Sequence, residues 1–79
     1  MIEAHIIGPY GSLYYSAPAT PYDLQNLRTH VREATSASPQ RVFVELTLDR
    51  SERADRALQP QVSHLVHELK SKGVAIRVL

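Results

Sequence analysis

The chain has 79 residues, of which 43% are hydrophobic and 22% charged, and nine basic residues against eight acidic ones leave a net charge of +1. A chain this short can form one hydrophobic core only, and its composition excludes a disordered tail. Cysteine is absent, which excludes disulfides and thiolate metal sites, so packing alone must hold the core.

The N-terminal half of the chain predicts a β-hairpin followed by a helix. Alternating apolar residues favour a strand over residues 2–7, and the Gly-Pro-Tyr-Gly segment at 8–11 has the residues of a tight turn. A second short strand at residues 13–15 is expected to run antiparallel to the first, because the connection is so short. Thr20 is placed to cap a helix that ends near Ser36. The apolar stripe of this helix has helical spacing and consists of Leu24, Leu27, Val31 and Ala34.

The C-terminal half predicts a strand, a helix and a final strand. Residues 41–48 carry the strongest strand pattern of the chain, and a charged loop is expected over residues 49–56. Apolar residues at helical spacing from Leu58 to Leu69 indicate a second helix. Gly73 is suited to end that helix, and residues 74–79 alternate as a last strand.

This order of elements, β-β-α-β-α-β, predicts a single small α/β domain over residues 1–79. Right-handed crossovers would place both helices on one face of the sheet if the last three strands lay side by side in sequence order. Each strand has one apolar face, whereas the other face is mostly polar, which disfavours a second covering layer. We therefore expect a two-layer fold with a four-stranded mixed sheet and both helices on one face.

Two segments, together with this layout, carry a family resemblance. Arg41-Val-Phe-Val-Glu-Leu-Thr is similar to a central strand that ends in Asp-Leu-Ser, and Asp55-Arg56-Ala57-Leu58 stands where Asp-Ser-x-Gly-Leu would be expected. The number of residues from this second segment to Lys72-Gly73-Val74 is also similar to that in the same family. With these features the chain resembles the STAS domain, the family of anti-sigma-factor antagonists and sulfate-transporter tails. Arg56 replaces the family's phosphorylatable serine, the family's glycine is missing, and residues 1–79 do not include its usual C-terminal helix. The resemblance therefore implies a regulatory module without phosphorylation at that position.

Residues able to support catalysis or metal binding do not form a recognisable pattern. His64 and His67 lie three residues apart on the second predicted helix, but no third ligand is identifiable. We expect both on a solvated face, with His64 paired to Glu68. The glycines at 8–12 match neither a dinucleotide nor a phosphate-loop motif, and no nucleophile elbow is present. No catalytic residue, metal or cofactor is assigned.

The charged loop at 49–56 is a candidate anion-binding site. It follows the C-terminal end of a central strand and leads into a helix, a common ligand-binding position in α/β sheets. Three arginines could grip a phosphate or carboxylate, although interleaved acidic residues could equally make the loop self-paired and solvated. The candidate residues are Arg50, Ser51, Arg53 and Arg56.

The polar face of the sheet is a candidate interaction surface. Phe43 would lie there as an apolar anchor among polar groups, the usual make-up of a small binding hot spot. The early tyrosines leave two interpretations open: an interface, or a core Tyr15 with the others at edges. The candidate interface residues are Phe43, Glu45, Thr47, Arg77 and Tyr14.

These observations favour a non-catalytic protein-interaction or regulatory module over an enzyme. Its expected partner is another protein or a second copy of the chain, bound through the open sheet face. The alternative is a binder of a small anionic ligand at residues 49–56. The balanced charge disfavours nucleic acid. No apolar stretch approaches the roughly 20 residues of a membrane helix and no signal peptide is evident, so we expect a cytoplasmic domain without membrane association.

Overall fold

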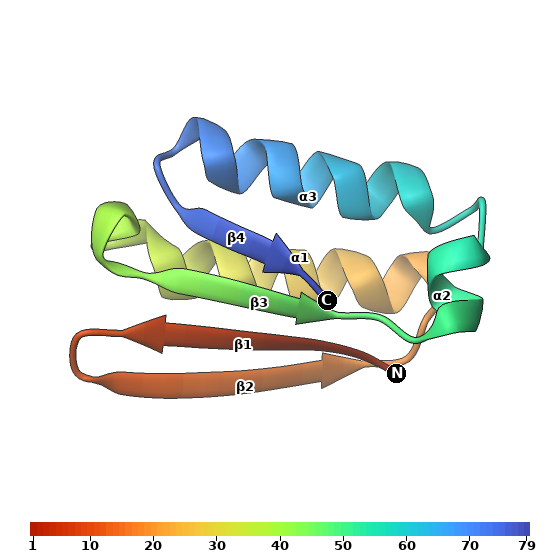
Figure 1. The fold of residues 1–79 in the computed structure, drawn as a ribbon, viewed down its shortest axis with the longest axis horizontal. Helices are drawn as coiled ribbons and strands as arrows, with labels where there is room; N and C mark the ends of the chain where they lie inside the picture. The colour runs from red at the N-terminus through yellow and green to blue at the C-terminus, as the bar shows by residue number, and fades with distance from the viewer.

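Four strands, three α-helices and one 3₁₀ turn make up the computed structural model, which describes residues 1–79 (Figure 1). The sheet order is β2-β1-β3-β4, with β1 antiparallel to both of its neighbours and β3 parallel to β4. The predicted α/β fold with a four-stranded mixed sheet is confirmed. The elements are β1 (Ile2–Gly8), β2 (Gly11–Ala17), α1 (Pro21–Ser36), the 3₁₀ turn (Pro39–Arg41), β3 (Phe43–Thr47), α2 (Arg50–Ala54), α3 (Gln59–Ser71) and β4 (Ala75–Val78).

One face of the sheet is covered by the two long helices. In β1 and β3, buried residues alternate with exposed or partly buried ones, which is the pattern of a sheet with one covered face. Helix α1 packs on β1 and β2, α3 packs on β4, and the two helices contact each other. The core is one cluster, comprising Ile2, Ala4, Ile6, Ala17, Leu24, Leu27, Val31, Val44, Leu46, Leu48, Leu58, Leu65, Leu69 and Val74.

The strand order differs from the arrangement considered above. Strand β1 lies between β2 and β3, so the β2–α1–β3 connection passes over β1 instead of joining neighbouring strands. Both helices still lie on one face because β2, β3 and β4 run in the same direction and are taken in order across the sheet. Right-handed crossovers then place each connecting helix on the same side.

Several element boundaries were predicted wrongly. Strand β2 has seven residues instead of three, and Figure 1 shows it as a full-length partner of β1. Strand β3 begins at Phe43 because Pro39 starts a 3₁₀ turn just before it. On α1, Ala34 is partly buried against the core as expected, and Thr35 is buried in addition, where its hydroxyl donates to the Val31 carbonyl oxygen at 2.9 Å.

The ends of the long helices agree with the sequence. The Thr20 side chain accepts a hydrogen bond from the backbone N–H of Asp23 at 3.1 Å, which caps α1. Gly73, with φ of 87°, follows α3, where the Gly73 and Val74 N–H groups donate to the carbonyls of Lys70 and Leu69. This pair of bonds is a Schellman motif. No helix here is both long enough and apolar enough to cross a membrane.

Candidate functional site

The uncovered face of the sheet presents its side chains in rows across the strands. The pairing register places Tyr14 opposite His5, His5 opposite Glu45, and Glu45 beside Arg77. The next row contains Ile7 and Phe43, followed by Ala75. On the other side of the Tyr14 row lies the row of Ser16, Glu3 and Thr47. All five predicted interface residues therefore lie on one face.

An aromatic pair occupies the β1–β2 side of this face. The His5 and Tyr14 rings stack with centroids 4.0 Å apart and an interplanar angle of 9°. Tyr14 is 70% exposed, whereas His5 is partly buried and its Nε2 atom has no hydrogen-bond partner. The pair borders a hollow of about 190 Å³ that is also lined by Glu3, Glu45, Thr47 and Leu79.

An ion pair and an aromatic ring occupy the β3–β4 side. The Arg77 Nη2 atom donates to the Glu45 carboxylate at 2.7 Å, and the Arg77 Cζ atom lies 5.8 Å from the centre of the Phe43 ring. That distance is within the range of a cation–π contact. Phe43 is partly buried and faces Ile7 across the strand pair. It is therefore not the isolated apolar residue expected from the sequence, although strand alternation already placed Ile7 on this face.

The segment 49–56 is mostly a short helix and not the loop that was predicted. Asp49 and Glu52 form a capping box: the Asp49 carboxylate accepts from the Glu52 N–H, and the Glu52 carboxylate accepts from the Asp49 N–H, both at 2.8 Å. The Ser51 hydroxyl donates to Asp49 at 2.7 Å. The backbone N–H of Glu52 and this hydroxyl hold the pKa of Asp49 below its usual value.

The candidate anion-binding residues have different surroundings within this segment. Ser51 is engaged with Asp49, and the Arg53 Nε atom donates to the Leu48 carbonyl oxygen at 3.2 Å. Arg50 and Arg56 are exposed. The anion-binding hypothesis stays a prediction.

Glu52, which was not among the candidate residues, forms an ion pair with the N-terminal amine. Its side chain is only 5% exposed and lies 3.0 Å from the Met1 amine. The hydrogen bond to Glu52 raises the pKa of that amine. Burial of this carboxylate is compatible with the fold because both the amine and the Asp49 N–H satisfy it. The Asp-x-x-Glu spacing was the available sequence signal for the capping box.

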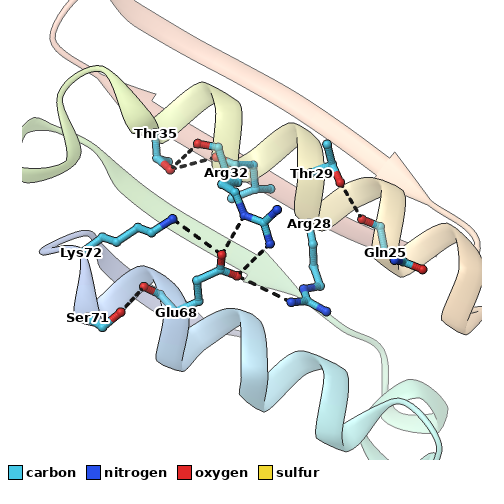
Figure 2. A network of polar contacts seen from close by, with 9 residues as sticks. Gln25, Arg28, Thr29, Arg32, Thr35, Glu68, Ser71 and Lys72 are labelled. Carbon is cyan, nitrogen blue, oxygen red and sulfur yellow. Dashed lines mark hydrogen bonds and ion pairs between the residues drawn. The ribbon is translucent and has the colours of Figure 1, made fainter.

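Glu68 is paired with three basic side chains and not with His64 as predicted (Figure 2). The Arg32 Nε atom lies 2.7 Å from its carboxylate, and Arg28 and Lys72 nitrogens each lie at 3.6 Å. The hydrogen bond from Arg32 holds the pKa of Glu68 below its usual value. Arg28 and Arg32 extend from α1, so the cluster links the two long helices (Figure 2).

The remaining candidates lie on the helix side of the molecule. His64 and His67 are exposed on α3, and no three histidine or carboxylate side chains are placed to hold a metal ion. Tyr15 is partly buried and stacks on His30 at 5.2 Å, whereas Tyr22 is 73% exposed. Comparison with models of protein families, with curated proteins and with solved structures finds no match to this chain.

Proposed function

We propose that this chain is a non-catalytic interaction module that binds another protein through the open face of its sheet. The observation that carries the proposal is that Phe43 and Ile7 are cross-strand neighbours on a face that no other element covers. The ion pair of Arg77 and Glu45 borders these two apolar side chains. An apolar centre with a polar rim is the usual composition of a protein interface. A regulatory role, as the STAS resemblance implies, fits the same surface.

The Phe43 side chain is held in place before any partner arrives. Arg77 lies over one face of the ring, and Ile7, 38% exposed, is its cross-strand neighbour. Because the ring is already ordered, binding costs less conformational entropy than it would for a freely rotating side chain. Arg77 is 61% exposed, so its ion pair contributes little to folding and is available to orient a partner.

The test is a comparison of Phe43→Ser with Tyr22→Ser. Tyr22 is exposed on α1, outside the open face, so the second variant removes an accessible aromatic ring without touching the proposed surface. A partner captured with the wild-type chain and then purified should bind Phe43→Ser at least tenfold more weakly, since a central aromatic anchor contributes about 2 kcal/mol or more. Binding of Tyr22→Ser should be unchanged by calorimetric titration.

The control for folding is the circular dichroism spectrum and melting curve of each variant. A Phe43→Ser chain that is folded and binds the partner as tightly as wild type would contradict the proposal. Equal weakening by both variants would also contradict it, because the contact would then not be specific to the open face.

A further inference from the structure

Strand β2 is an edge strand without the features that normally protect such edges. It is seven residues long, and its outer side has no neighbour in the sheet (Figure 1). Alternate residues of an antiparallel strand direct their N–H and C=O groups away from the paired side, so β2 presents unpaired backbone groups. Natural edge strands are usually short or carry charges, prolines or bulges. The sequence of β2, Gly-Ser-Leu-Tyr-Tyr-Ser-Ala, has no charge and no proline, and its register with β1 is unbroken.

The opposite edge of the sheet is different. Strand β4 has only four residues and includes a charged side chain, Arg77. Both are protective features. The contrast within one sheet indicates that β2, and not β4, is suited to pair with another strand.

The sequence of β2 is nearly symmetric about Tyr14. When a second copy of the strand runs antiparallel to the first with the two Tyr14 residues opposite each other, Ser12 lies opposite Ser16 and Leu13 lies opposite Tyr15. Gly11 then lies opposite Ala17. Small, hydroxyl and apolar residues therefore meet their own kind when two copies of the strand run antiparallel. A charged residue on the two-fold axis would meet its own copy, which is destabilising, but the axis position is Tyr14 and β2 has no charged residue.

We propose that two copies of this chain associate through β2, antiparallel, with Tyr14 on the two-fold axis. The axis is perpendicular to the sheet, so two four-stranded sheets join into one continuous sheet with all long helices on the same side. The contact is isologous and therefore closes at two copies. The proposal does not rest on the open-face function, whose centre is Phe43 and Ile7 and whose partner is another protein; of the five candidate interface residues only Tyr14 lies on β2.

The side chains that β2 leaves exposed are those that the pairing covers. Leu13 is 51% exposed and Tyr14 is 70% exposed. In the dimer, Leu13 packs against Tyr15 of the second copy, whose ring is already fixed by its stack on His30. The two Tyr14 rings meet on the open face, where each is already stacked on His5. The dimer contact thus buries the exposed apolar side chains of β2 and pairs its free backbone groups at the same time.

The first measurement is the oligomeric state of the wild-type chain by sedimentation velocity over a range of concentrations. A concentration-dependent monomer–dimer equilibrium without larger species is expected. A chain that stays monomeric at about 1 mM, where even weak specific association is detectable, would overturn the proposal. Growth beyond the dimer would also overturn it, because the contact closes on itself.

The second measurement tests the register with cysteines, since the chain has none of its own. Directly opposite residues of antiparallel strands have Cα atoms about 4.5–5.5 Å apart, which a disulfide can span. The double variant Ser12→Cys/Ser16→Cys should therefore oxidise to a covalent dimer. Within one chain the two positions are roughly 13 Å apart at 3.3 Å per residue, too far for an internal bond.

The matched controls are the two single variants. Ser12→Cys alone places its sulfur opposite a serine and about 13 Å along the strand from its own counterpart, so neither single variant should cross-link efficiently. Efficient cross-linking by a single variant, or none by the double variant, would reject the proposed register. If β2 instead pairs with a strand of another protein, the double variant should not cross-link and the wild-type chain should be monomeric.

Charge substitutions at the same positions provide a readout without oxidation. Ser12→Glu/Ser16→Glu places glutamates opposite each other and should weaken dimerisation at least tenfold. Ser12→Glu/Ser16→Lys places opposite charges across the two-fold axis and should restore it. Equal dimerisation of the two variants in sedimentation velocity, with both chains folded, would overturn the assignment of β2 as the contact.

Discussion

Neighbouring positions on α3 show how strongly the surroundings of a residue decide its contribution to stability. Leu65 has no exposed surface and lies in the core cluster, whereas His67, two residues later, is exposed. Successive residues of a helix point in directions about 100° apart, so one residue faces the sheet and the other faces solvent. The hydrophobic stripe read from the sequence is confirmed at these positions.

Truncation of these two side chains should therefore have very different effects. Leu65→Ala leaves a cavity beneath the helix and should lower the free energy of unfolding by roughly 2–5 kcal/mol. His67→Ala removes a solvated side chain and should change it by no more than about 0.5 kcal/mol. Urea denaturation of both variants measures the difference, and similar losses would mean that the orientation of α3 is wrong.

At the scale of the element, the link from α3 to β4 depends on one glycine. Gly73 adopts a φ of 87°, a region that side-chain-bearing residues rarely occupy. Its N–H and that of Val74 close the helix by donating to carbonyls of the last turn. The chain can then reverse direction and place Val74, which is 3% exposed, in the core. The left-handed residue therefore positions the start of β4 beside β3.

Substitution of this glycine should destabilise the fold. Gly73→Ala places a Cβ atom in the left-handed region, where the cost is roughly 1–2 kcal/mol, and that atom would lie 3.4 Å from the Gln40 side chain. Gly8→Ala is the matched control, because an added Cβ there would meet its nearest neighbour, Val42, at 3.6 Å, an ordinary contact. Thermal melts should show a lower midpoint for Gly73→Ala only, and equal midpoints would contradict the argument.

At the scale of the whole molecule, Glu68 links parts of the chain that are distant in sequence. Its carboxylate joins α3 to Arg28 and Arg32 of α1 (Figure 2), above a core that the same helices share with the sheet. Glu68 is 18% exposed, so its pairing is less screened by water than a surface ion pair would be. The ion pairs and the shared core therefore fix the two helices relative to each other.

The stability of the fold should decrease in acid, in part through this carboxylate. The pKa of Glu68 is lowered in the folded chain, chiefly by the hydrogen bond from Arg32, whereas an unfolded glutamate titrates near 4.3. The folded state therefore binds fewer protons, and the stabilisation is complete above about pH 4.3 and is lost as the pH falls through the lowered value. Chemical denaturation at several pH values should show this loss.

The control for the acid effect compares two glutamine substitutions. Glu68→Gln should flatten the decrease in stability below about pH 4.3, because the titrating partner of Arg32 is gone. Glu33→Gln changes an exposed glutamate of α1 that takes part in no ion pair and should leave the profile unchanged. An unaltered acid profile in Glu68→Gln would show that the cluster does not contribute to the pH dependence.

The features that could be predicted from the sequence are those set by near neighbours along the chain. The cap at Thr20, the stop at Gly73 and the alternation of β1 each depend on residues within one turn or one strand. The open face also followed from alternation, which placed Phe43 opposite to the buried Val44. These local rules were sufficient for the fold class and for the list of residues on the candidate surface.

Other features were decided only when distant segments came together. The insertion of β1 between β2 and β3 depends on strand pairing across the whole chain. The same holds for the partners of Glu68 and for the Met1 amine beside Glu52. Periodicity states which side of an element is buried but not which element covers it. Sequence alone therefore determined the faces of each element, whereas tertiary packing, through the free energy of long-range contacts, selected their neighbours.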